Sequence, residues 1–171
     1  MIVHRDRDYL SDDDVDAFKQ ALDAHDISVF VTDGSDVESY FVNPAYLNQC
    51  NPAVSSARIG ELIEVARNMT KATSIEAIVN LRTQEAFRKR NQGGAGPNHG
   101  QIAVAAATDY DGNPALMMRG KVVLNRIKAL IQQEQGTNAV VLMTSPHLTV
   151  QALRNIVNPP APAPGAPAIA N

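Results

Sequence analysis

The pattern of apolar and polar residues along the chain predicts a mixed α/β fold. Residues 1–3 form a short apolar run that ends in a burst of charge, and residues 27–32 form a second continuous apolar run. Both have the length of a buried strand. Between them, Val15, Phe18 and Leu22 recur at helical spacing. Strand, helix and strand in about 30 residues make a βαβ unit with two parallel strands.

Capping signals predict where the first helices start. Ser11 followed by the aspartates at 12–14 is typical of a helix N-terminus, because the serine caps and the acids suit the positive end of the helix dipole. Capping therefore explains this acidic run better than metal binding does. Ser35 and Glu38 have the spacing of a capping box. Asn43-Pro44 ends that helix and can start another short one.

Residues 53–91 change to helical periodicity throughout. Ser56 and Ser74 are candidate caps and residues 70–73 a candidate break, so we expect an antiparallel pair of helices inserted into the α/β part or packed beside it. The far end of this segment is basic, with Arg82, Arg88, Lys89 and Arg90. Such a cluster is more typical of a solvated helix end, where it complements the dipole, than of a phosphate contact.

The remaining chain mixes loops and short elements. Residues 92–100 form a glycine-rich loop without the Gly-Lys-Ser/Thr ending of a P-loop, which excludes nucleotide binding of that kind. Residues 102–107 can be a strand or a helix, since a short alanine-rich run fits both. Residues 139–143 are a strand candidate, and a last helix is expected through Ile156. From Pro159 onward the Pro-Ala tail cannot build a core, and we expect it to be disordered.

Gly120-Lys121 opens a well-defined amphipathic helix that ends before Gly136. A lysine beside a helix N-terminus can hold a phosphate or stabilise charge that develops on it. The alternative is an ordinary surface lysine, and the residues leave both interpretations open.

Composition limits the setting of the protein. The chain has 171 residues, enough for one domain with a real core. Its net charge is −3, so any nucleic-acid contact must be local. The single Cys50 cannot form an internal disulfide and fits a reducing cytoplasm. No run approaches the roughly 18 apolar residues of a membrane span, so we expect a cytoplasmic protein without a membrane partner.

Asp6 and Asp8 are the candidate metal ligands. They follow the first predicted strand, and in an extended chain they project the same way. Two adjacent carboxylates repel unless a cation lies between them, and Mg²⁺ prefers such oxygen ligands. The plainer alternative is a polar loop whose alternating arginines and aspartates pair on the surface.

Residues 3–10 (VHRDRDYL) and 38–41 (ESYF) resemble the TOPRIM domain of the overcoming-lysogenization-defect nucleases. They are equally similar to TOPRIM domains attached to AAA-type ATPases in bacterial antiphage defence. In that family the acidic pair follows a central parallel strand and binds divalent metal for phosphodiester cleavage. The likeness is strongest over residues 1–50 and weaker over 114–157. A complete domain begins with an earlier strand carrying a catalytic Glu, so the resemblance implies the C-terminal part of a TOPRIM domain.

The resemblance implies a metal-dependent endonuclease that uses Mg²⁺ or Mn²⁺. Asp6 and Asp8 would be ligands, Glu38 a ligand or an orienting carboxylate, and Lys121 an electrostatic stabiliser. The expected partners are nucleic acid, DNA rather than RNA, an ATPase segment in cis or in trans, and further copies of the chain. The competing hypothesis is a non-catalytic interaction module or an inactive remnant.

The domain map expected from these arguments has four parts: a TOPRIM-like acidic βαβ core at 1–52, an inserted helical hairpin at 53–91, a return to the α/β core at 92–157, and a disordered tail at 158–171.

Overall fold

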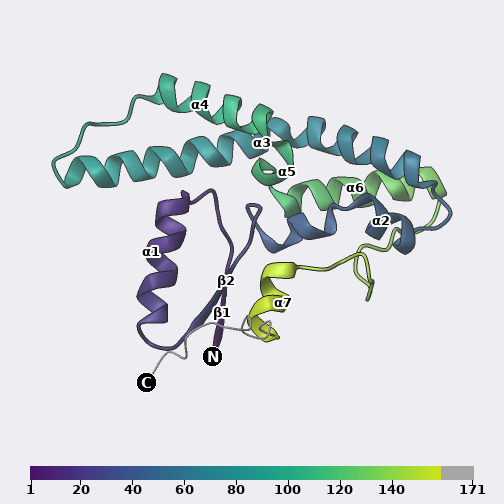
Figure 1. Cartoon of the computed structure of the whole chain (residues 1–171). Coiled ribbons are helices and arrows are strands. Elements are labelled where there is room, and N and C mark those ends of the chain that lie inside the picture. The colour runs from purple at the N-terminus through teal and green to yellow at the C-terminus, as the bar shows by residue number, and fades with distance from the viewer. Residues whose placement is uncertain (159–171) are drawn as a thin grey trace.

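The computed structural model describes residues 1–158, so the tail from Pro159 onward, predicted to be disordered, lies outside the described residues. The elements in chain order are β1 (Ile2–Arg5), α1 (Asp12–Asp23), β2 (Ser28–Val31), the 3₁₀ helix η1 (Val37–Phe41), α2 (Pro44–Cys50), α3 (Ser56–Asn91), α4 (His99–Gly112), α5 (Pro114–Met117), α6 (Gly120–Gln135) and α7 (Gln151–Val157). Helices dominate, and the strands and α1 lie to one side of the long helix α3 (Figure 1).

The predicted parallel βαβ unit is confirmed. β1 and β2 pair in parallel, with Ile2 opposite Ser28, and they are the only two strands among residues 1–158. α1 starts as predicted, because the Ser11 side chain accepts the backbone N–H of Asp14. Phe30 and Val31 are both buried; successive strand residues face opposite sides, and α1 and α7 both contact β2.

The predicted hairpin within residues 53–91 is wrong, because α3 is one helix of 36 residues, about 54 Å long. The polar residues at which we expected the helix to end form hydrogen bonds within α3 or to another element. The Thr70 hydroxyl donates to the Ala66 carbonyl at 2.8 Å, and the fully buried Ser74 accepts a backbone N–H from Arg119. Ser55, one residue before the predicted Ser56, is the N-cap. The antiparallel neighbour of α3 is instead α4, which runs beside it (Figure 1).

The segment at 139–143 is not a strand, contrary to the prediction. Its backbone forms hydrogen bonds with two side chains: Tyr46 of α2, and Asn51, the residue after α2. Val140 N–H donates to Asn51 Oδ1 at 2.9 Å, and the Asn51 amide donates back to the Val140 carbonyl at 2.8 Å. Met143 N–H donates to the Tyr46 hydroxyl at 3.0 Å. Two side chains thus take the place that a neighbouring strand would have.

The later helices largely follow the sequence pattern. Residues 102–107, for which the sequence pattern fitted both a strand and a helix, belong to α4. α6 begins at Gly120 and ends at the left-handed Gly136, with φ of 70°. The short α2 starts after the predicted Asn43 cap, and a last helix, α7, includes Ile156.

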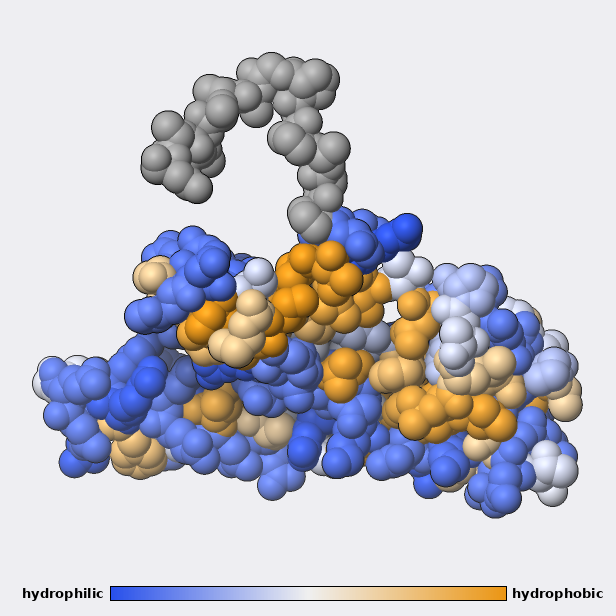
Figure 2. Space-filling model, turned by 90° about the horizontal axis from the view of Figure 1, so that it is seen from below, coloured by the Kyte–Doolittle hydropathy of each residue, from blue (hydrophilic) through white to orange (hydrophobic). Residues whose placement is uncertain are grey.

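The hydrophobic core lies between α2, α3 and α6, away from the sheet. Its fully buried members include Tyr46, Leu47, Ile59, Val123, Ile127 and Ile131. Large apolar side chains remain exposed on the strand side, among them Met1 and Ile2, and Figure 2 shows hydrophobic patches on the lower face. Within residues 1–158, the apolar stretches of the helices are too short to cross a membrane.

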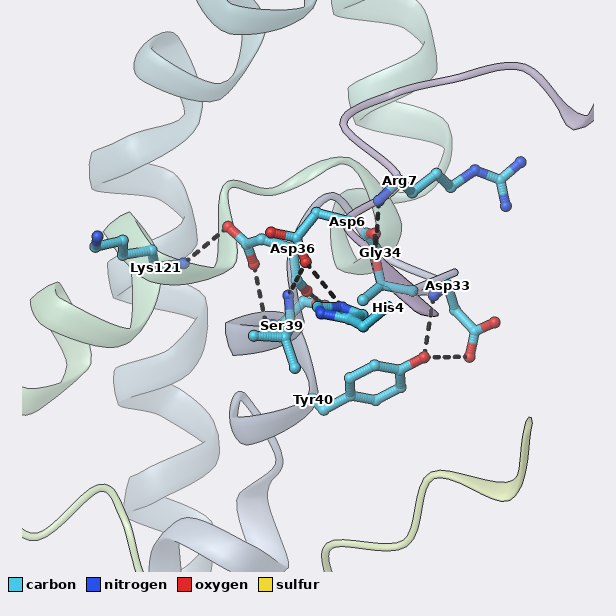
Figure 3. A network of polar contacts seen from close by, with 11 residues as sticks. His4, Asp6, Arg7, Asp33, Gly34, Asp36, Ser39, Tyr40 and Lys121 are labelled. Atoms are coloured by element: carbon cyan, nitrogen blue, oxygen red, sulfur yellow. Dashed lines mark hydrogen bonds and ion pairs between the residues drawn. The ribbon is translucent and has the colours of Figure 1, made fainter. Parts of the chain in front are cut away.

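Three polar side chains hold the start of α6, and Figure 3 shows one of them, Asp36. The Asp36 carboxylate accepts the backbone N–H of Lys121 at 3.1 Å and that of Ser39 at 3.1 Å. The Ser35 hydroxyl donates to the Met118 carbonyl at 2.6 Å. The third is Ser74 of α3, already described. We call this set of contacts the α6 junction; it joins the loop after β2, α3 and α6.

The junction corrects the predicted capping box. The N-cap of η1 is Asp36, not Ser35, and the Glu38 side chain is not bonded back to the cap. Ser35 is buried and faces Met118 instead. Asp36 satisfies one N–H group in each of two helices, and α6 has no side-chain cap of its own.

Glycine at position 120 allows this close approach. A Cβ built there would overlap the Asp36 carboxylate and the Ser39 backbone nitrogen, and would lie 2.7 Å from the Ser39 Cα. A Cβ at Gly34 would likewise overlap the Ser39 hydroxyl. The first turns of η1 and α6 can therefore meet only if position 120 lacks a side chain.

A pair of glycine substitutions tests the junction. We expect Gly120→Ala to lower the free energy of unfolding by about 1–3 kcal/mol, because its Cβ has no space. Gly60→Ala lies in the interior of α3 with nothing within 4 Å, so it should raise that free energy by about 0.5–1 kcal/mol. Urea denaturation of both variants measures the difference, and shifts of the same sign would contradict the packing described.

The pH dependence of stability tests the environment of Asp36. Burial raises the pKa of its carboxyl above the usual 3.8; the Lys121 N–H opposes this and the Glu38 and Asp6 charges add to it. A raised pKa in the folded state means that the folded chain binds this proton more tightly than the unfolded chain. The stability that the proton confers is therefore complete below pH 3.8 and is lost as pH rises through the folded pKa.

Asp36→Asn removes this titration and one of the two acceptor oxygens. We expect the variant to be less stable than wild type at low pH, and the gap to narrow as pH rises from about 3.5 to about 7. Urea denaturation of both proteins across this range measures the gap. If the difference in free energy of unfolding stays constant or widens with pH, ionisation of Asp36 does not destabilise the fold.

Candidate acidic site at the carboxyl edge of the sheet

The carboxyl ends of the two parallel strands meet at one edge, which is where open α/β folds place ligands. Asp6 directly follows β1, and its Oδ1 accepts the backbone N–H of Val37 at 3.1 Å, from the first residue of η1. The same oxygen lies 3.3 Å from Nε2 of His4. Asp6 thus connects the end of β1 to the start of η1. Its Oδ2 has no hydrogen-bond partner within the described part of the chain and is open to a ligand.

Asp8 lies at this edge for a different reason from the one predicted. β1 ends at Arg5, and Asp8 and Tyr9 both have positive φ, of 45° and 64°. The alternation of an extended strand therefore does not apply to Asp6 and Asp8, and a tight turn positions the second carboxylate. Burial, followed by the Asp6 charge, raises the pKa of Asp8, and Arg5 and Arg119 partly offset this.

Glu38 lies in the first turn of η1 and is partly exposed. Its charge contributes to the raised pKa of Asp36, after burial, so the two carboxylates are electrostatic neighbours. Asp36 was not among the predicted site residues. Its signal was present, because an Asp three residues before Ser39 is a usual capping arrangement, but the capping box one residue earlier obscured it.

Lys121 contacts the acidic residues through its backbone. Its N–H donates to Asp36, whereas its ammonium group projects away from the carboxylates (Figure 3). The cation whose charge acts on Asp8 from this part of the chain is Arg119, two residues earlier. Sequence reasoning missed Arg119, since no motif distinguishes an arginine before a helix start.

The segment ESYF has a clear structural role. The Tyr40 hydroxyl donates to the Asp33 carboxylate and accepts the Asp33 backbone N–H, both at 3.0 Å (Figure 3). Phe30 stacks against both Tyr40 and His4, with ring centroids 6.3 and 5.4 Å away. Tyr40 therefore fixes the turn after β2 and supports the residues of the edge.

Taken together, charges link four carboxylates in pairs: Asp6 acts on both Asp8 and Asp36, and Glu38 acts on Asp36. Two of them, Asp6 and Asp36, also accept backbone N–H groups. Among residues 1–158, however, no three His, Cys, Asp or Glu side chains are arranged so that they could hold a metal ion. Side chains would have to reorient toward a cation for more than two of these carboxylates to bind it.

Comparisons with known proteins give no family for the chain. No family model matches it, and neither a curated protein nor a solved structure is similar enough to count as a match. The residues of the edge and their geometry are therefore the basis for a functional proposal.

Proposed function

We propose that the acidic edge binds a divalent cation, Mg²⁺ or Mn²⁺, and that the domain hydrolyses phosphodiester bonds in nucleic acid, with DNA as the expected substrate. The observation that supports this is the position of Asp6 at the end of β1, where its charge acts on Asp8 and on Asp36 of the loop after β2. Burial raises the pKa of both Asp8 and Asp36, and the charges of neighbouring carboxylates raise it further. A bound cation would remove this repulsion.

In this proposal Asp6 and Asp8 are the metal ligands, and Glu38 is a ligand or orients one. A cation held there by Asp6 and Asp8 would supply positive charge for the phosphoryl oxygens and a more acidic bound water. Lys121 can stabilise the developing charge only if its side chain turns toward the edge. Arg119, whose charge already acts on Asp8, is better positioned for that role.

A second candidate function is an interaction module. The observation that favours it is the incomplete sheet, since β1 pairs only with β2 among residues 1–158 and Ile2 is 48% exposed. Two-stranded sheets are marginal by themselves, and a free edge can accept a strand from another segment. We propose that an ATPase segment or a further copy of the chain pairs with this unpaired side of the sheet.

Metal binding is the first test. Mn²⁺ titrated into the wild-type protein should bind, and the double variant Asp6→Asn/Asp8→Asn should not bind it, because both proposed ligands become neutral amides. Isothermal titration calorimetry measures this. The matched control is Asp13→Asn/Asp16→Asn, which removes the same charge from exposed positions of α1 and should bind as wild type does. Equal binding by both double variants would end the metal proposal.

Cleavage is the second test. A two-metal centre, with ions about 3.5–4 Å apart, needs more carboxylates than Asp6, Asp8 and Glu38 supply. We therefore expect little cleavage by the 171-residue chain alone. A strand-bearing TOPRIM segment with a Glu, fused or added in trans, should restore cleavage in Mg²⁺ or Mn²⁺, and Asp6→Ala should abolish it again. Gel analysis of labelled DNA measures this.

Two outcomes of that experiment would change the proposal. Robust metal-dependent cleavage by the chain alone would show that the site needs no added carboxylate. If the added segment binds but no cleavage follows, the interaction module becomes the better description.

A further inference from the structure

A groove runs along one side of α3. Two cavities, of about 390 and 470 Å³, lie next to each other and share Leu81 and Gln84 in their linings, and we call the two together the groove. Its α3 wall extends from Thr73 to Arg88, 15 residues or roughly 22 Å along the helix. The opposite wall extends from Arg5, the last residue of β1, to Asp14 in α1, with Arg119 at the end nearest Thr73.

Asp8 of the acidic edge also lines this groove. It shares the larger cavity with Arg119 and with Asn80 of α3. The groove therefore leads directly to one of the two proposed metal ligands. Any chain that lies in it would have a backbone unit next to Asp8.

Three arginines line the groove without an ion-pair partner in the described part of the chain. Arg119 lies at one end, and Arg5 and Arg88 lie at the other. In contrast, Arg7 and Arg82, which line a neighbouring cavity, are paired with Asp12 and Asp109 respectively. The Arg5 guanidinium lies 4.5 Å above the centre of the Phe18 ring, which orients it.

Acidic side chains outnumber these arginines, since Asp8, Asp14, Glu76 and Glu85 also line the two cavities. The groove is therefore not a broad positive surface. An anionic chain would gain affinity only at its two ends, where the arginines lie. Between them, the amides of Asn80 and Gln84 offer hydrogen bonds to bases.

We propose that this groove binds single-stranded nucleic acid, with phosphates on Arg5 and Arg88 at one end and on Arg119 at the other. The inference rests on the proposed function, because it delivers a phosphodiester to Asp8. The arginines at the two ends of the groove can each contact a different phosphate of the same strand. Cavities of this volume are in the range that holds small organic groups, which suits single nucleotides rather than a duplex.

The test is fluorescence anisotropy with labelled 12-nucleotide single-stranded DNA and RNA, in EDTA and in Ca²⁺. We expect Arg88→Gln/Arg119→Gln to weaken binding at least about tenfold in both buffers, and to reduce the slope of log affinity against log salt by about 1.4. The control Arg126→Gln/Lys128→Gln removes the same charge from α6, outside the groove, and should bind as wild type does. Circular dichroism checks that each variant is folded.

A third variant gives a result of opposite sign. Asp8→Asn removes a negative charge from the groove, so in EDTA it should tighten binding of the single strand. Duplex DNA of the same sequence should bind more weakly than the single strand. Preference for the duplex, equal losses in the groove and control variants, or no binding in either buffer would each overturn the groove proposal.

The outcomes separate this inference from the proposed function. Arginine-dependent binding without Mn²⁺ binding at Asp6 and Asp8 would support the groove and overturn the nuclease. Mn²⁺ binding at the acidic edge without any oligonucleotide binding would overturn the groove and leave the metal site standing.

Discussion

The carboxylate of Asp36 is the interaction on which the arrangement of the two halves depends. It lies at the end of the βαβ unit and accepts N–H groups from both η1 and α6. α6 has no side-chain cap of its own, and each uncapped helix start typically costs about 0.5–2 kcal/mol. One side chain therefore satisfies two helices and joins the sheet to the helical core. Gly120 is the matching requirement, since only a residue without a Cβ admits this contact.

This structural use limits what the acidic edge can do chemically. Asp6 and Asp36 both accept backbone N–H groups, so a cation would find them already oriented and partly occupied. Asp8 and Glu38 accept no such bond in the described residues and are free to turn. A bound cation can therefore use Asp6 only through Oδ2, with Asp8 and Glu38 supplying further carboxylate oxygens.

Local patterns predicted what local forces determine. The Ser11 cap and the Gly136 terminus were correct because each depends on neighbouring residues alone. The break expected at 70–73 failed, because tertiary contacts sustain α3 there despite its weak local signal. The role of Asp36 could not be predicted, since its second donor lies 85 residues further along the chain. The position of Asp8 depends on a left-handed turn that residue spacing does not reveal.

The uninterrupted length of α3 has a mechanical consequence. The helix is tied to α6 near its middle, through Ser74, and its far half extends to Asn91 beside α4. From Ser74 to Arg88 the distance along the axis is about 21 Å, so a tilt of about 5° at the tie would displace Arg88 by roughly 2 Å. The far half of α3 is therefore a rigid extension of the helix beyond its contact with α6 at Ser74. Any change in the angle of α3 at Ser74 would therefore be largest at Arg88, which lines the groove together with Arg5.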